Sequence, residues 1–277
     1  MTGQPLWQCF DLIFGTSTGA IIAALLALGR KVSDVRALYE RHVPRVMQAW
    51  PTRAARSRAL EALAKEVFAE ARFEDVKTGI GIVVARWEFE TPMIFKASSQ
   101  QAHGRHASFI PGFGCSIADA VQASCSAYPF FEKKVVTTDA GHQVTLIDGG
   151  YCANNPTLYA IADAVMAFER NRAALRVVSI GVGVYPEPKR FGWQWLVRRV
   201  PSVKLLQKTL DINTLSMEKL RSVLCRDVQT VRINDTFERP EMATDLMEHD
   251  LTKLNQLYQR GCESFAQNEQ QLRAFLL

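Results

Sequence analysis

Short apolar runs alternate with helical patterns along the first 180 residues of the chain. The run Phe10–Phe14 is followed by a stretch of glycine, threonine and serine and then by the apolar segment Ala20–Gly29. This order predicts a buried strand, a sharp turn and a helix. Apolar runs bounded by turn residues predict further strands at 81–85, 91–96, 144–147 and 176–181.

Helical patterns fill the spaces between these strands. Residues 33–73, interrupted by prolines, predict two or three helices that cover the sheet, and 156–170 predicts an amphipathic helix. Ser116, with Asp119 three residues later, resembles a capping box that opens an alanine-rich helix ending near Tyr128-Pro129. The alternation predicts an α/β fold with a largely parallel central sheet flanked by helices.

No stretch rich in glycine, serine or proline divides the 277 residues, so we expect one domain over 1–277. Residues 211–277 are mostly helical in pattern and form the C-terminal part of the same domain. The 48% hydrophobic content is enough for a well-buried core.

The charge and the cysteine content indicate which partners and which cellular compartment suit this chain. The net charge of +5 favours anionic surfaces but is too small to indicate a partner such as a nucleic-acid duplex. The six cysteines form no C-x-x-C pair and lie among apolar or small residues, which indicates reduced thiols. The longest apolar run, 12–28, is broken by Gly-Thr-Ser-Thr-Gly, and no leader pattern precedes it. We therefore expect a soluble, cytoplasmic protein.

Gly15-x-Ser17-x-Gly19 matches the pattern of a nucleophile elbow, in which small residues allow a tight turn from a strand into a helix. The pattern lies between a predicted strand and a predicted helix, the context that the mechanism requires. Ser17 is then the candidate nucleophile, and the N–H of Thr18 is a candidate oxyanion donor. The alternative is an ordinary glycine-rich turn.

A serine nucleophile needs a base, and the candidates are one aspartate and five histidines. Asp148 ends an apolar strand and precedes Gly149 and Gly150, which would let the backbone approach closely. A plain Asp-Gly-Gly turn is the alternative. A histidine base in the chain order of an α/β-hydrolase would have to be His249, which lies in a charged helical segment typical of a solvated surface.

Three segments together resemble patatin-like phospholipases: the elbow 15–19, the alanine-rich helix running to Tyr128-Pro129-Phe130-Phe131, and 146–156 with its Asp-Gly-Gly. The resemblance covers residues 10–183 well and is looser beyond. It implies a patatin-like three-layer fold and a serine–aspartate dyad: Ser17 attacks an ester carbonyl, Asp148 takes the proton, and water releases the fatty acid. It implies no cofactor and no metal, and the sequence contains no metal-binding motif.

One feature of the family is absent from this chain. Patatin-like proteins carry an Asp-Gly-Gly-Gly-type loop upstream of the elbow, whose N–H groups form the oxyanion hole, but only sixteen residues precede Ser17 here and 1–8 contain no such loop. Removing one oxyanion donor typically lowers the rate by roughly 10²- to 10³-fold. We therefore expect residues 1–277 by themselves to be nearly inactive.

Residues 189–200 place apolar side chains at helical spacing beside several cations. Trp193, Trp195, Arg198 and Arg199 are candidate contacts of an interfacial helix at a lipid surface. The alternative is a helix that packs its apolar stripe on the core.

The sequence therefore predicts a serine acyl-ester hydrolase that releases fatty acids from membrane phospholipids and acts in the cytoplasm, peripherally at the inner membrane. Because some bacterial relatives are antiphage effectors activated by cyclic nucleotides, the resemblance also suggests a cyclic-nucleotide activator. A homo-oligomer is compatible with the sequence. The alternative function is a non-catalytic regulatory or scaffold protein that keeps the fold without a complete oxyanion hole.

Overall fold

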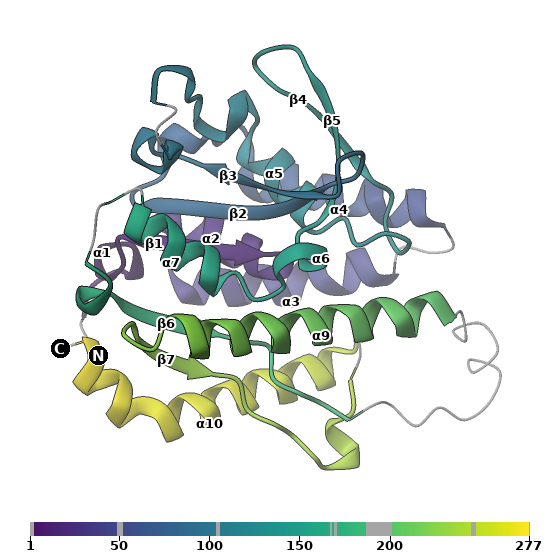
Figure 1. The fold of residues 1–277 in the computed structure, drawn as a ribbon. Coiled ribbons are helices and arrows are strands. Elements are labelled where there is room, and N and C mark those ends of the chain that lie inside the picture. Colours follow the sequence, from purple (N-terminus) through teal and green to yellow (C-terminus); the bar gives the residue numbers. More distant parts are fainter. Residues whose placement is uncertain are drawn as a thin grey trace.

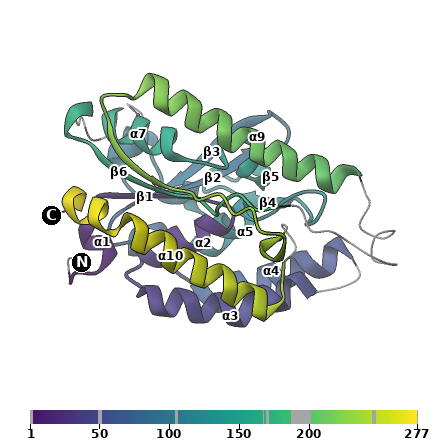
Figure 2. The same cartoon turned by 90° about the horizontal axis from the view of Figure 1, so that it is seen from below.

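The computed structural model describes residues 3–48, 52–103, 106–166, 168, 171–186, 201–244 and 248–276. A sheet lies between two helical layers (Figures 1 and 2). One layer contains α2 (Thr18–Ala27), α3 (Val32–Gln48), α4 (Arg53–Phe68), α5 (Ile117–Ser124) and α10 (Leu251–Leu276). The other contains α6 (Gly150–Ala153), α7 (Thr157–Met166) and α9 (Pro201–Leu224). The short α1 (Leu6–Cys9) precedes the first strand.

The central sheet has five strands: β1 (Leu12–Thr16), β2 (Gly79–Arg86), β3 (Thr91–Lys96), β4 (Lys134–Thr137) and β5 (Gln143–Asp148). β6 (Arg176–Ile180) and β7 (Gln229–Ile233) form a separate parallel pair. The predicted α/β class is confirmed, but the expectation of a largely parallel sheet needs correction. β1 and β2 are parallel, whereas β2–β3, β2–β5 and β4–β5 are antiparallel. Short turns join β2 to β3 and β4 to β5, and such turns can only connect antiparallel strands.

The register places the ends of β1 and β5 face to face. β1 pairs with the first half of β2, up to Thr16 opposite Val83, and β5 pairs with the second half, from Asp148 opposite Val84. β3 occupies the other edge of β2. β1 and β5 therefore run toward each other along one edge of β2, and the residues that follow them meet above adjacent positions of that strand.

Most of the predicted elements are present with shifted ends. The helix predicted at 20–29 is α2, and the helices predicted within 33–73 are α3, which contains Pro44, and α4. Ser116 caps α5 by accepting from Asp119 N at 3.0 Å, as the capping pattern predicts. The helix ends at Ser124, earlier than the expected end near Tyr128; there Ser124 Oγ donates to Val83 O, and Ser126 O accepts from Asp148 N of β5. Six 3₁₀ turns complete the described elements: η1 (Phe73–Asp75), η2 (Ser99–Ala102), η3 (His106–Ser108), η4 (Pro111–Gly114), η5 (Arg172–Ala174) and η6 (Pro240–Met242).

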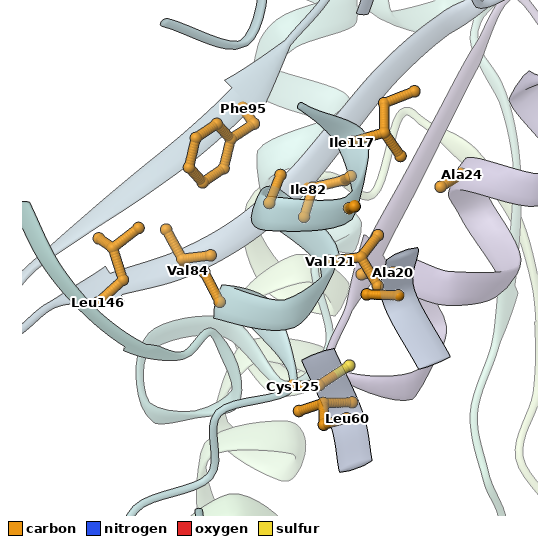
Figure 3. Close-up of a cluster of buried hydrophobic side chains, with 14 of the residues drawn as sticks. Ala20, Ala24, Leu60, Ile82, Val84, Phe95, Ile117, Val121, Cys125 and Leu146 are labelled. Carbon is orange, nitrogen blue, oxygen red and sulfur yellow. The ribbon is translucent and has the colours of Figure 1, made fainter. Parts of the chain in front are cut away.

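The hydrophobic core lies between the sheet and the helices α2, α4 and α5. Figure 3 shows Ala20 and Ala24 of α2, Val121 of α5 and the strand residues Ile82 and Val84 converging there. Alanines on the buried face of α2 let this helix approach the strands closely. Close packing of this kind fixes the turn between β1 and α2 with little freedom to move.

The C-terminal part is less uniformly helical than predicted. α9 begins at Pro201, ahead of residue 211, and β7 interrupts the helices within 211–277. Residues 230–233 alternate polar and apolar side chains, a two-residue period that signals a strand and that the helical interpretation overlooked. Among the described residues, no helix has the length and apolarity needed to cross a membrane.

Candidate active site

Ser17 lies at the turn from β1 into α2 with φ 55° and ψ −128°, a backbone conformation that non-glycine residues rarely adopt. A side chain at Gly15 would place its Cβ 2.2 Å from Gly19 O, so only glycine allows the turn to be this tight. The turn also leaves Ser17 ahead of the first N–H groups of α2, which have no partner within the helix. These features are those of the predicted nucleophile elbow.

The hydroxyl of Ser17 donates a hydrogen bond to Asp148, with 2.6 Å between Oγ and Oδ2. The two residues are 131 positions apart in sequence and meet because β1 and β5 end face to face. The partner of this hydroxyl is therefore the aspartate that the sequence singled out. His249 lies between η6 and α10, where its N–H donates to Glu248, and not in this hydrogen bond.

Asp148 is 2% exposed and lies against the backbone of its own loop and of β2. Its Oδ1 accepts from Gly150 N at 2.7 Å. A Cβ at Gly149 would lie 2.1 Å from Val83 O, so this glycine lets the loop cross closely over β2. Burial raises the pKa of Asp148 from 3.8 to about 6, although the hydrogen bonds from Ser17 and Gly150 act in the opposite direction. A carboxylate with this pKa is ionised at neutral pH and can accept a proton.

Two further side chains hold the elbow in place, and the sequence did not single them out. Ser17 N donates to Ser124 Oγ at 2.9 Å, and Ser124 Oγ in turn donates to Val83 O at 2.7 Å. Thr16 Oγ1 donates to Ala153 O at 2.7 Å and so joins the elbow to the helix after Asp148. Ser124 ends the alanine-rich helix and is fully buried. In the sequence, the available signal was a small polar residue at the end of an apolar helical pattern. We interpret Ser124 as a positioning residue.

The remaining predicted residues are placed as follows. Thr18 is exposed at the first position of α2, and Gly19 has open space where a side chain would lie. Trp193, Trp195, Arg198 and Arg199 lie outside the described residues, so the interfacial helix predicted there stays a prediction. Within the described part of the chain, no group of three or more His, Cys, Asp or Glu side chains is arranged to hold a metal ion.

A serine at a strained strand-to-helix turn, bonded to a buried carboxylate, has the features of a nucleophile with its base and defines the class of serine hydrolases. A family model described as patatin-like phospholipase matches residues 4–161, more than half of the chain. The chain therefore belongs to the patatin-like phospholipase family, a family of carboxylic ester hydrolases.

Curated relatives give a finer comparison. The chain is 62% identical over 282 aligned positions to a cUMP-AMP-activated phospholipase of Escherichia coli, covering 100% of this chain and 86% of that protein. It is 26% identical over 190 positions to a cGAMP-activated phospholipase of Pseudomonas aeruginosa, covering 65% of this chain and 54% of that protein. It is 24% identical over 209 positions to the calcium-independent phospholipase A2-gamma of Mus musculus, covering 69% of this chain and 26% of that protein.

Proposed function

We propose that Ser17 and Asp148 form a catalytic dyad that hydrolyses the acyl esters of membrane phospholipids. The observation that carries the proposal is the 2.6 Å hydrogen bond from Ser17 Oγ to the buried carboxylate of Asp148. Asp148 takes the proton as Ser17 Oγ attacks the ester carbonyl, and it then returns the proton to the departing alcohol of the lysophospholipid. In the second half, Asp148 takes a proton from water, whose oxygen attacks the acyl-serine, and Ser17 leaves with that proton as the fatty acid is released.

Each tetrahedral intermediate carries an oxyanion that needs N–H donors. We propose Thr18 N–H as one donor, because it follows the nucleophile and lies in the first turn of α2. A second donor would come from a glycine-rich strand and loop of the kind that the family carries. The edge of β1 opposite β2 has no paired strand among the described residues, and this edge is where such a strand would bind.

We also propose that a cyclic nucleotide regulates the enzyme as part of an antiviral response. The support is the 62% identity to a protein named for its activation by cUMP-AMP, together with the more distant relative named for activation by cGAMP. The net charge of +5 suits an anionic activator. We place the enzyme in the cytoplasm and peripherally at the inner membrane; its six cysteines form no C-x-x-C pair and lie among apolar or small residues, a pattern that supports a reducing compartment.

A fluorophosphonate probe tests the dyad directly, since it reacts covalently with an activated serine. We expect labelling of the folded protein that disappears in Ser17→Ala. Any hydrolysis of a soluble short-chain ester that residues 1–277 retain without the glycine-rich loop should disappear in the same variant. Ser33→Ala, at an exposed serine of α3, is the matched control and should keep full labelling. A folded parent protein that neither reacts with the probe nor hydrolyses ester would contradict the proposal and support the non-catalytic scaffold.

The raised pKa of Asp148 predicts the pH dependence of hydrolysis. Only the carboxylate can act as base, so we expect kcat/KM for a soluble ester to be level above the Asp148 pKa of about 6. Below it, kcat/KM should fall roughly tenfold per pH unit. Protonation of Asp148 does not itself destabilise the fold: because its folded-state pKa is raised, the contribution of Asp148 to stability is present at pH below 3.8 and lost as pH rises through about 6. Circular dichroism at each pH provides the check, and an acid limb near the ordinary value of 3.8 would contradict the assignment.

A further inference from the structure

The outer face of α9 exposes a stripe of large aliphatic side chains. The exposed fractions are 68% for Leu205, 65% for Ile212, 65% for Leu215, 46% for Leu220 and 47% for Val223. At about 100° per residue these five side chains, here called the α9 stripe, fall within an arc of about 140° and extend over about 27 Å of helix. A large exposed apolar patch on a folded protein often marks a site that binds another protein or a membrane.

The charges within the arc of the stripe have one sign. Lys208 and Lys219 are exposed and fall inside the arc, whereas Asp211, also exposed, lies beyond its edge. Glu218 points away from the arc and contacts Arg221 and Asn155. An aliphatic face that carries lysines and no carboxylate is complementary to a surface that is apolar inside and anionic outside.

The opposite face of α9 packs on the loop that carries Asp148. Leu210 lies against Gly150, where an added Cβ would be 2.8 Å from its Cδ2. Asn213 accepts from Asn154 N at 2.9 Å and donates to Cys152 O at 3.0 Å. Figure 2 shows α9 as the outermost helix of its layer. A lipid surface on the stripe would therefore lie within about one helix diameter, roughly 10–12 Å, of the Asp148 loop.

We propose that the α9 stripe docks this enzyme on the surface of anionic phospholipid membranes. The inference rests on the proposed function, since the substrate then lies in the same bilayer that the stripe contacts. The aliphatic side chains enter the boundary between headgroups and acyl chains, and Lys208 and Lys219 meet lipid phosphates.

Vesicle binding in a Ser17→Ala background tests docking without hydrolysis. Ile212→Glu should weaken binding to phosphatidylglycerol–phosphatidylcholine vesicles by roughly 10- to 100-fold, since it replaces an aliphatic group that enters the membrane with a charge. Val32→Glu, the same kind of change at a 58% exposed aliphatic residue of α3 in the opposite layer, is the control and should bind as the parent does. Ile212→Trp should strengthen binding, because tryptophan favours the membrane interface.

The lysines give a second, independent measurement. Lys208→Gln with Lys219→Gln should weaken binding to phosphatidylglycerol vesicles by roughly 25-fold, about fivefold for each charge, and leave binding to pure phosphatidylcholine vesicles unchanged. Parent-like vesicle binding by folded Ile212→Glu, or by the double lysine variant, would overturn the proposal. Binding of a second copy of this chain to the stripe would also overturn the proposal. That outcome would appear as a loss of dimer mass in Ile212→Glu with vesicle binding unchanged. Hydrolysis of a soluble ester by the Ser17-containing protein is scored separately, so its failure would count against the dyad and not against docking.

Discussion

Asp148→Asn is expected to leave the fold intact and lower ester hydrolysis by roughly 10²- to 10⁴-fold, the usual effect of removing a general base. An amide can keep both contacts of the carboxylate, since its oxygen can accept from Gly150 N and its NH₂ group can donate to Ser17 Oγ. It cannot take the proton that Ser17 must lose. The variant therefore separates the chemistry of Asp148 from its role in the structure.

Stability provides the second readout of the same variant. A rise of the Asp148 pKa from 3.8 to about 6 disfavours the ionised form in the folded protein by about 3 kcal/mol, at about 1.4 kcal/mol per pKa unit. Asp148→Asn removes this penalty, so its free energy of unfolding at pH 8 should equal or exceed that of the parent. Asp34→Asn, at an exposed carboxylate of α3, is the control and should keep full turnover. A folded Asp148→Asn protein with most of its turnover would remove Asp148 from the mechanism.

The two glycines of the elbow are expected to respond in opposite directions to the same substitution. Gly15→Ala would place a Cβ 2.2 Å from Gly19 O and 2.7 Å from Ala20 Cα, so backbone must move. Overpacking of this kind lowers stability by about 1–3 kcal/mol or more. Because the clash is within the turn, Ser17 Oγ should also be displaced, and a displacement of about 1 Å can lower turnover by roughly 100-fold.

Gly19→Ala is the matched control within the same motif. Nothing lies within 4 Å of its added Cβ, and the position is inside α2. Replacing a helical glycine by alanine should raise the free energy of unfolding by up to about 1 kcal/mol. Thermal unfolding of the two variants, with fluorophosphonate labelling of Ser17, measures both effects. Equal melting temperatures would show that the elbow tolerates a side chain at Gly15 and that the steric account is wrong.

The sequence by itself determined the local chemistry of this protein. Gly15, Ser17 and Gly19 lie between an apolar run and a helical pattern, and this order defines a strand, a tight turn and a helix without reference to the rest of the chain. Asp148 at the end of its strand was identifiable in the same way. These features depend on residues that are close together in the sequence, because the steric rules that set turns and strand ends act between such neighbours.

The tertiary structure decided how these pieces meet. Strand periodicity says which face of a strand is buried but not which strand pairs with it, so the antiparallel β5 and the meeting of its end with the end of β1 could not be derived from the pattern. Ser124 supports Ser17 from 107 positions away, a contact that packing alone creates. The α9 stripe has the same origin: its five leucine, isoleucine and valine side chains are exposed because only the other face of the helix packs on the Asp148 loop, and a sequence pattern cannot say which apolar face will be covered.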